Sequence, residues 1–202
     1  MAAYVPTPYP SAVKLLNLCE LSKEDIIVDL GSGEGAIPAL AAFVFGSKKA
    51  VGVELDSARI WRSRQTANAL RLGLDRVEFL RGDALSLDLG QFDVVTIFQS
   101  QETIERLLGK LFVELRRGAR VVSYLLPLGT MSPLKFVRPA RIEYPFYLYK
   151  APLEYLSQDE AVEMLDEIAQ FAERSEREWA LVSSTSNSQT SNGWCPSAQG
   201  PA

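Results

Sequence analysis

The stretch IIVDLGSGEG, residues 26 to 35, decides how this chain folds. Its opening residues, Ile26 to Val28, are apolar and β-branched, which favours a short buried strand. An acid, Asp29, follows, and then come three glycines at alternate positions and an apolar helical pattern. Glycines at a strand-to-helix turn let the backbone bend tightly and approach a ligand, and the next helix presents free backbone N–H groups. Because Gly-x-Gly-x-Gly also occurs in ordinary turns, its neighbours decide the interpretation.

Two further apolar strands end in an acid. The segment 50–54 ends in Glu54, and the strand that begins at Val77 leads into Gly82-Asp83-Ala84. A carboxylate roughly 20 residues beyond a glycine loop is placed to accept hydrogen bonds from ribose hydroxyls. Each acid alone fits a solvated strand end. Because the carboxyl ends of parallel strands meet at one edge, however, Asp29, Glu54 and Asp83 together predict a site for a nucleotide-like ligand.

The glycine spacing and the acids in and before the loop indicate which nucleotide-like ligand this site would bind. A site for NAD prefers Gly-x-Gly-x-x-Gly, and the spacing here is shorter. Asp29 precedes the loop and Glu34 lies inside it. Carboxylates repel a pyrophosphate but suit a ligand with a sulfonium and an amino group. The loop therefore favours S-adenosylmethionine (SAM) as the cofactor.

Composition predicts one globular catalytic domain. The 202 residues carry a net charge of -4, enough chain for a substantial core. No apolar run approaches the roughly 20 residues that span a bilayer, and no signal-peptide pattern is visible, so no membrane association is expected. The chain has no histidine and two cysteines, Cys19 and Cys195. We therefore expect no metal site, no imidazole chemistry, and a reducing compartment, the cytoplasm.

Alternating strands and helices predict an α/β fold. We expect a doubly wound, mainly parallel seven-stranded sheet with helices on both faces, and an antiparallel strand at its C-terminal edge. A capped amphipathic helix should precede the first strand, and the helix after the glycine loop should be buried. The expected helices span residues 11–21, 36–45, 57–72 and 101–115, and the remaining strands span 92–98, 120–126, 135–142 and 146–150.

The C-terminal part of the chain differs in character. A capping box at residues 157–160 opens an amphipathic helix. Residues 151–202 hold nine acids and two bases, against 16 acids and 19 bases in residues 1–150. We predict a domain over 1–150, an acidic helix over 151–182 and a disordered tail over 183–202. The helix is either a docking helix with a solvated face or a partner site.

Two other surfaces each admit two interpretations. The proline-rich residues 3–10 form either a disordered arm or a strap over the cofactor pocket. The arginines of the helix over 57–72 form either a solvated face or a nucleic-acid surface, and the solvated face is the commoner case.

Five motifs recur in the order expected for one branch of the methyltransferases. They are YVPTP at residues 4–8, DLGSGEG at 29–35, KKAVGVE at 48–54, GARVVS at 118–123 and YLY at 147–149. Together they resemble class I SAM-dependent methyltransferases, and among these the small archaeal protein-lysine methyltransferases of broad specificity. That group is similar to the FAM173 mitochondrial lysine methyltransferases and the Dot1 catalytic core. The resemblance covers about Tyr4 to Lys150.

This resemblance implies a Rossmann-like fold and a set of cofactor-binding residues. The glycine loop would cradle the methionine moiety, Glu54 would hold the ribose, Asp83 and Ala84 would contact adenine, and the N-terminal arm would strap the cofactor. The implied cofactor-binding residues are Tyr4, Val5, Pro6, Thr7, Asp29, Gly31, Ser32, Gly33, Gly35, Glu54, Leu55, Asp83 and Ala84.

The resemblance also places the methyl acceptor at the end of the fourth strand, residues 96–100. These residues depart from the Asn-Pro-Pro-Tyr pattern of enzymes that methylate nucleic-acid bases and glutamine, as the lysine enzymes do. We expect direct in-line displacement by a neutral lysine amine, with positioning and desolvation as the main work of the protein. No general base is identified. The candidate residues for the acceptor pocket are Phe98, Gln99, Tyr124 and Tyr144.

The predicted function is therefore protein-lysine methylation by a monomer that acts on exposed lysines, without a stable nucleic-acid partner. One alternative is a class I methyltransferase acting on RNA or a small molecule, which the absence of a strongly basic domain weakens for RNA. Another is a catalytically idle SAM-binding module. An NAD-dependent dehydrogenase is the most distant alternative.

Overall fold

The computed structural model describes residues 5–133, the backbone of 135–137, residues 144–160, and the separate positions 162–164, 166, 169, 170 and 173. The chain divides into two units, Met1–Leu156 and Ser157–Ala202. The first unit contains the sheet and every residue discussed below as part of a site. None of the helices in the described residues is long and apolar enough to cross a membrane.

One mixed sheet organises the first unit, with the strand order β3-β2-β1-β4-β5-β7-β6. The strands are β1 (Ile26–Leu30), β2 (Lys49–Glu54), β3 (Val77–Arg81), β4 (Val94–Ile97), β5 (Arg120–Tyr124), β6 (Lys135–Val137) and β7 (Phe146–Lys150). The first five are parallel, β7 pairs antiparallel with β5, and β6 pairs antiparallel with β7. The predicted mainly parallel sheet with an antiparallel C-terminal edge is confirmed. The part of the predicted last strand pair at residues 138–142 lies outside the described residues.

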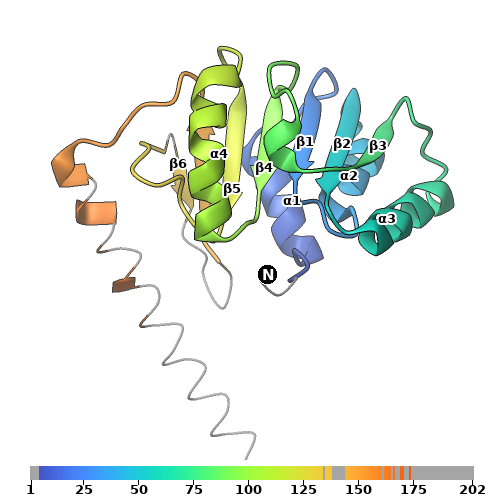
Figure 1. The fold of residues 1–202 in the computed structure, drawn as a ribbon, viewed down its shortest axis with the longest axis horizontal. Helices are drawn as coiled ribbons and strands as arrows, with labels where there is room; N and C mark the ends of the chain where they lie inside the picture. The colour runs from blue at the N-terminus through green and yellow to red at the C-terminus, as the bar shows by residue number, and fades with distance from the viewer. Residues whose placement is uncertain are drawn as a thin grey trace, which may run out of the picture. The chain divides into compact units, whose positions relative to one another are not determined.

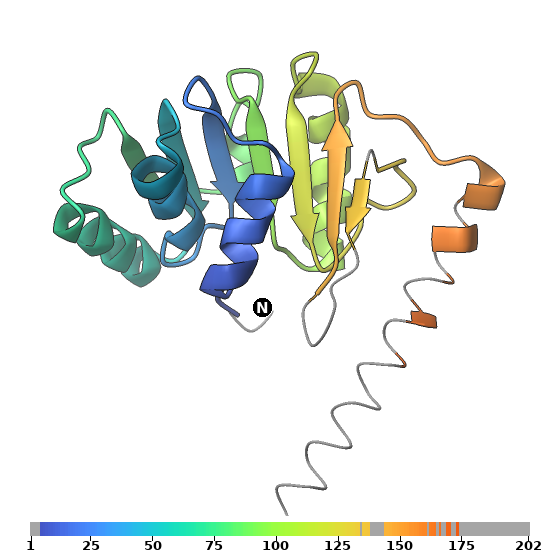
Figure 2. The same cartoon turned by 180° about the vertical axis from the view of Figure 1, so that it is seen from behind.

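Helices cover both faces of the sheet (Figures 1 and 2). Helix α4 lies on one face, whereas α1 and α2 lie on the other. The helical elements of this unit are α1 (Tyr9–Leu18), α2 (Ala36–Leu40), the π-helix η1 (Ala41–Phe45), α3 (Ser57–Ala69), the 3₁₀-helix η2 (Ala84–Ser86) and α4 (Gln101–Glu114).

Apolar spacing explains why each helix packs as it does. In α4, Ile104, Leu107 and Leu111 recur at helical intervals and are fully buried. On the opposite face, Leu15 and Leu16 of α1 join the cluster that contains Ile27 of β1. Two apolar layers therefore hold the sheet between them, and the polar residues that matter for function lie at its edges.

The start of α1 and the helix after the glycine loop differ from the sequence-based expectation. Helix α1 begins at Tyr9 and no side chain caps it, because its N-cap residue is Pro8, whose side chain has no hydrogen-bond acceptor. The segment expected as one buried helix is α2 followed by η1, and Phe43 and Val44 are each 57% exposed. The guanidinium of Arg76 donates to the carbonyls of Ala42 and Ser47 at 3.1 and 3.3 Å. These bonds join the end of the π-helical segment to the residue that precedes β3.

The second unit begins with the predicted capping box. The backbone N–H of Ser157 donates to Oε2 of Glu160 at 2.9 Å, and the N–H of Glu160 donates back to the Ser157 hydroxyl at 3.4 Å. The described residues between 158 and 173 are helical. The predicted tail over 183–202 lies outside the described residues, and the domain boundaries stay predictions.

Candidate functional site

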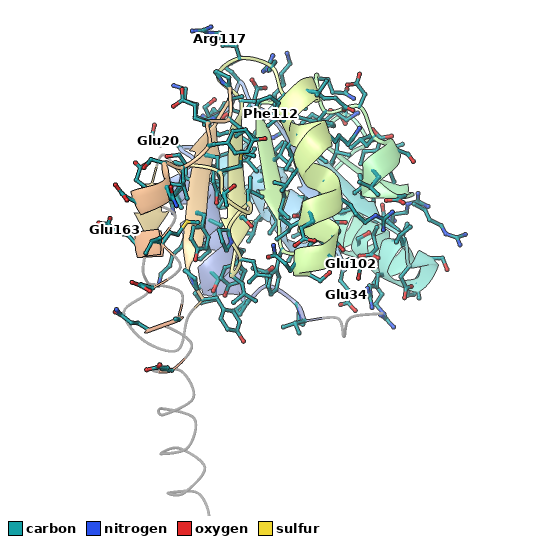
Figure 3. The ribbon with its side chains drawn as sticks, turned by 60° about the vertical axis from the view of Figure 1, so that its left-hand side comes forward. Glu20, Glu34, Glu102, Phe112, Arg117 and Glu163 are labelled. Atoms are coloured by element: carbon teal, nitrogen blue, oxygen red, sulfur yellow. The ribbon has the colours of Figure 1, made fainter. Side chains whose placement is uncertain are left out.

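The parallel strands bring their carboxyl ends to a single edge. In register, Leu30 of β1 lies opposite Val53 of β2 and Ile97 of β4, and Glu54 lies opposite Arg81 of β3. Figure 3 shows Glu34 of the glycine loop and Glu102 of α4 at this edge, with Glu20 and Arg117 at the opposite one. Ligands bind at the carboxyl edge of such sheets, so the predicted site residues are brought to the expected place.

The glycine loop crosses from the end of β1 toward β2. The N–H groups of Gly31 and Ser32 both donate to the carbonyl of Val53 at 2.9 Å. Gly31, Gly33 and Gly35 have φ of 85°, 54° and 82°, in the left-handed region that other residues rarely adopt. A Cβ on Gly35 would lie 2.5 Å from the ring of Phe79. Gly35 is therefore required both by its positive φ and by its close packing against Phe79.

Glu54 bonds to the glycine loop with one side-chain oxygen and to the start of α3 with the other. Oε2 accepts from the N–H of Gly33 at 2.9 Å, and Oε1 accepts from the N–H of Asp56 at 3.0 Å. The guanidinium of Arg59 lies 3.6 Å from Oε1. A carboxylate has about four acceptor positions. Glu54 therefore combines a structural role with remaining capacity for ligand hydroxyls.

Asp29 is a buried acid at the centre of the edge. Its side chain is 5% exposed, and Oδ1 accepts from the hydroxyl of Thr96 at 2.7 Å. The pKa of Asp29 is raised to about 7, mainly because the carboxyl is buried; the Thr96 hydrogen bond lowers this pKa and the nearby Glu54 charge raises it. Near neutral pH this carboxyl changes charge easily, and a cation placed beside it favours the charged form.

The other predicted cofactor-binding residues differ in how far they are exposed to solvent. Ser32 is buried, and its hydroxyl has no hydrogen-bond partner within the described part of the chain. Asp83 is exposed and its carboxylate accepts from the N–H of Leu85 at 3.0 Å, while Ala84 is half-buried and Leu55 is exposed.

The N-terminal arm is only partly described. Val5 and Pro6 are exposed, and Thr7 is half-buried. Tyr4 lies outside the described residues. From Pro8 the chain enters α1, because the carbonyl of Pro8 accepts from the N–H of Ala12 at 2.9 Å. The strap assigned to this arm stays a prediction.

Three of the four candidate acceptor residues form an aromatic cluster. The ring centroids of Phe98 and Tyr124 are 4.8 Å apart, and those of Tyr124 and Tyr144 are 5.7 Å apart. Tyr144 is 41% exposed, whereas Tyr124 is buried. The structure adds Phe146, whose ring stacks on Tyr124 at 4.8 Å. Phe146 was not predicted from the sequence. It lies opposite Tyr124 in the antiparallel pair of β5 and β7, so a correct prediction of that register would have identified it.

Gln99, the fourth candidate, connects β4 to the glycine loop. Its side-chain nitrogen donates to the carbonyl of Leu30 at 3.0 Å. A Cβ on Gly31 would overlap that nitrogen and would lie 2.8 Å from Cδ. The amide therefore lies directly over the first glycine of the loop. Thr96, three residues earlier, was given no role from sequence, yet its hydroxyl is the partner of Asp29.

The arginines of α3 contact other parts of this unit. Arg62 pairs with Glu34 at 2.9 Å, and Arg64 donates to the carbonyl of Phe79 at 2.8 Å. Arg59 lies within 4 Å of both Glu54 and Asp56. These contacts favour the interpretation of this helix as a solvated face that supports the site. No cluster of three or more potential metal ligands occurs among the described side chains.

Comparison with known proteins assigns the chain to a family. The model of the ANTKMT methyltransferase domain matches residues 29–135, which include Asp29, the glycine loop, Gln99 and Tyr124. The chain belongs to this methyltransferase family. It is 35% identical to "Protein-lysine N-methyltransferase" of Saccharolobus islandicus over 72% of this chain and 91% of that protein. The predicted resemblance to lysine methyltransferases is thereby confirmed.

Two further proteins are similar to this chain, and their names give different methyl acceptors. The chain is 35% identical to "Adenine nucleotide translocase lysine N-methyltransferase" of Mus musculus, over 66% of this chain and 58% of that protein. It therefore spans little more than half of the mouse relative. A solved structure described as an RNA methyltransferase from Salinibacter ruber with S-adenosyl-L-homocysteine is similar, with 31% identity and a TM-score of 0.70. The similarity covers 76% of this chain and 97% of that one.

Proposed function

We propose that this member of the family is a SAM-dependent protein-lysine N-methyltransferase, which methylates the side-chain amine of lysines exposed on other proteins. The observation that carries the proposal is 35% identity over 91% of an archaeal protein named protein-lysine N-methyltransferase. The carboxyl-edge site supports it, since the residues that would bind the cofactor and the acceptor lie at one edge of one sheet.

The donor set at this edge fits SAM. When bound, SAM supplies an electrophilic methyl group on a sulfonium whose leaving group is a neutral thioether. The glycine loop makes the tight turn that such a site needs, because Gly31, Gly33 and Gly35 all have positive φ. Glu54 retains acceptor capacity for ribose hydroxyls. The buried carboxyl of Asp29 is suited to a cationic ligand, because a nearby positive charge stabilises its ionised form.

The aromatic cluster around Tyr124 fits a lysine acceptor. A free lysine has a pKa near 10.4, so the amine must lose a proton before it attacks. An apolar environment disfavours the ammonium form and lowers that pKa. Phe98, Tyr124 and Tyr144 supply such an environment beside the end of β4. Their rings also stabilise a methylated ammonium product through cation–π attraction.

A second function is supported by one observation. A solved structure 31% identical to this chain is described as an RNA methyltransferase. Against an RNA acceptor, the arginines at positions 59, 62 and 64 are engaged in contacts within the first unit. The labelling experiment below distinguishes the two acceptors.

The proposal includes a compartment, a set of partners and a domain layout. We place the protein in the cytoplasm as a monomer whose partners are exposed-lysine proteins. The low cysteine content, with Cys19 and Cys195 far apart in the chain, supports a reducing compartment. The catalytic domain is proposed to span residues 1–150, with the acidic helix over 151–182 and the tail over 183–202 outside it.

Incubation with methyl-labelled SAM tests the function. Purified protein is mixed with cell extract, with and without RNase, and labelled products are identified by residue-level mass spectrometry. We expect label on lysine in both extracts, and none with the Asp29→Ala variant. Label that disappears with RNase and is absent from lysine would identify RNA as the acceptor. SAM binding without any transfer would leave a SAM-binding module.

A further inference from the structure

We propose that Arg59 is a positioning residue of the cofactor site, which balances the charge of the Glu54 carboxylate and holds it in place to bind the ribose hydroxyls of SAM. The inference goes beyond the proposed function, because it concerns the cofactor and holds for any methyl acceptor. It predicts that the loss of Arg59 weakens the recognition of the ribose and leaves the rest of the cofactor site intact.

Two buried acids lie close together at the carboxyl edge. Asp29 and Glu54 are 5% and 8% exposed, and the charge of Glu54 contributes to the raised pKa of Asp29. A buried carboxylate is costly unless a cation or hydrogen bonds compensate for it. Among the ion pairs of the residues that the structure describes, the one that reaches either acid comes from Arg59, whose Nη1 lies 3.6 Å from Oε1 of Glu54. Arg59 is therefore the side chain that supplies positive charge to this pair of acids.

The start of α3 holds Arg59 in this position. Asp56 is the N-cap of α3, and its carboxylate accepts from the N–H groups of Ala58 and Arg59 at 2.7 and 3.2 Å. Oδ2 of the same carboxylate lies 3.8 Å from Nε of Arg59. The backbone and the side chain of Arg59 therefore both contact Asp56, and the side chain is only 28% exposed. These contacts keep the guanidinium beside Glu54.

The distance between Arg59 and Glu54 leaves room for a ligand on the carboxylate. Glu54 accepts one hydrogen bond on each oxygen, from the N–H of Gly33 on Oε2 and from the N–H of Asp56 on Oε1. A carboxylate has about four acceptor positions, so about two remain. At 3.6 Å the guanidinium lies beyond the usual hydrogen-bond distance, so it supplies charge without filling either position. Two open positions on one carboxylate match the two adjacent hydroxyls of a ribose.

Arg62, one turn further along α3, provides a matched control. Its guanidinium pairs with Glu34 of the glycine loop at 2.9 Å, and the two side chains are 53% and 46% exposed. Water screens exposed ion pairs of this kind, so they contribute little to stability. Helix α3 thus has one partly buried arginine beside the acid expected to bind ribose and one exposed arginine beside an acid with no expected ligand contact.

The test uses calorimetry to measure the binding of S-adenosylhomocysteine and of its 2′,3′-dideoxy analogue, which lacks both ribose hydroxyls. We expect Arg59→Gln to lower the affinity for S-adenosylhomocysteine about fivefold and the affinity for the dideoxy analogue by less than about twofold. Arg62→Gln should change both affinities by less than about twofold. Retained binding of the dideoxy analogue also shows that the site of the Arg59→Gln variant is folded. Equal losses for the two ligands would overturn the inference, because a merely structural role predicts them.

SAM itself distinguishes positioning from a general effect of charge. SAM has a sulfonium and an ammonium against one carboxylate, so its net charge is positive. The removal of a nearby cation should therefore strengthen SAM binding if only long-range electrostatics changed. We expect the opposite, a weaker binding of SAM to Arg59→Gln, because the loss of ribose recognition is local and larger. SAM affinity equal to or higher than that of the wild type would overturn the inference.

A double-mutant cycle tests whether Arg59 acts through Glu54. Glu54→Gln keeps the size of the side chain but removes the charge that Arg59 balances, so Arg59→Gln should cost less than about twofold in affinity when it is added to Glu54→Gln. Additive losses would overturn the inference. None of these measurements involves a methyl acceptor. A protein that binds SAM but labels no lysine would therefore contradict the proposed function and leave this inference standing.

Discussion

At the scale of the residue, Asp29 combines a stability cost with a functional position. Its pKa is about 7 in the folded chain, against an ordinary value of 3.8 for an aspartate. Between these values the folded state binds more protons than the unfolded state, so stability falls as pH rises from about 4 to 7 and stays lower above it. Cofactor-free protein therefore carries the cost of a buried carboxylate above neutrality.

The variant Asp29→Asn should remove that cost. We expect its melting temperature without SAM to exceed that of wild type at pH 8, by about 2–4 °C for each kcal/mol gained. The gain should be smaller at pH 5, and SAM should no longer raise the melting temperature. Thermal unfolding at the two pH values checks this, with the exposed Asp83→Asn as control. A variant less stable than wild type at pH 8 would contradict the assigned cost.

The same pKa predicts how SAM binding depends on pH. A cationic ligand beside Asp29 lowers the pKa of this carboxyl, so binding should release a proton when the free protein is partly protonated. Affinity should therefore rise through pH 7 and level off above it. Calorimetry in two buffers of different ionisation enthalpy measures the proton released. Uptake of a proton, or an affinity that falls over this range, would contradict the prediction.

Glycine is required at position 31 for two reasons, its positive φ and its contact with Gln99, and their effects on stability can be measured separately. Gly31→Ala would place a side chain at φ 85° and also against the Gln99 amide, whereas Gly118→Ala has φ 86° with nothing within 4 Å. The strain alone costs about 1–3 kcal/mol. We expect both variants to lose stability in urea unfolding and Gly31→Ala to lose more. Equal losses would show that the Gln99 side chain can move away from an added methyl group without lowering the free energy of unfolding.

At the scale of the element, the first turn of α4 fixes the end of β4. Ser100 is the N-cap, and its hydroxyl accepts from the N–H of Thr103 at 3.4 Å and lies 3.1 Å from the Thr103 hydroxyl. Glu102 adds a negative charge in the first turn, where it is favourable to the helix dipole. The cap lies directly after Gln99 in the chain, so we expect its loss to affect both helix stability and the position of this candidate acceptor residue.

Removal of this cap should affect both stability and transfer. Ser100→Ala should destabilise the protein by about 1 kcal/mol and lower kcat on lysine peptides without weakening SAM binding. Ser100→Asp should restore both, because aspartate is an equally good cap. Chemical denaturation and steady-state kinetics check this. Unchanged kinetics in a destabilised Ser100→Ala protein would show that Gln99 is held without the cap.

At the scale of the whole molecule, residues 151–156 belong to the sheet-containing unit and form backbone hydrogen bonds within it. The N–H of Ala151 donates to the carbonyl of Ala119 at 2.8 Å, the N–H of Ser132 donates to Glu154, and the N–H of Leu156 donates to Thr130, the last two at 2.7 Å. The N–H of Gly118 donates to the carbonyl of Ala151 at 2.9 Å, and the bonds of Ser132 and Leu156 together make the bridge between Met131 and Tyr155. A protein truncated after residue 150, the predicted domain boundary, would lack these bonds. A protein truncated after Leu156 would keep them.

Two truncations test the boundary. A protein of residues 1–156 should keep the melting temperature and SAM affinity of the full chain, because every bond named above is retained. A protein of residues 1–150 should melt several degrees lower, since four backbone contacts, each contributing about 1 kcal/mol, are lost. Equal melting temperatures for the two truncations would support residue 150 as the boundary.

Much of the fold followed from local patterns. Alternating apolar strands and amphipathic helices predict a mainly parallel sheet, and IIVDLGSGEG predicts a strand, a tight turn and a helix. These features depend on side-chain periodicity and turn chemistry within a few residues, so the sequence carries them directly. The π-helix was not predicted, because its apolar sequence also fits an ordinary buried helix; its Ala42 carbonyl bonds to Arg76, 34 residues away.

By itself, the sequence determined the fold class, the glycine loop and the three acids at the strand ends, because each is encoded within a short segment. Only the tertiary structure decided that Thr96 bonds to Asp29 across 67 residues and that Gln99 bonds to Leu30 across 69. It likewise decided that Phe146 stacks on Tyr124. Strand order and register set these contacts, and register is a property of the packed sheet rather than of any one strand.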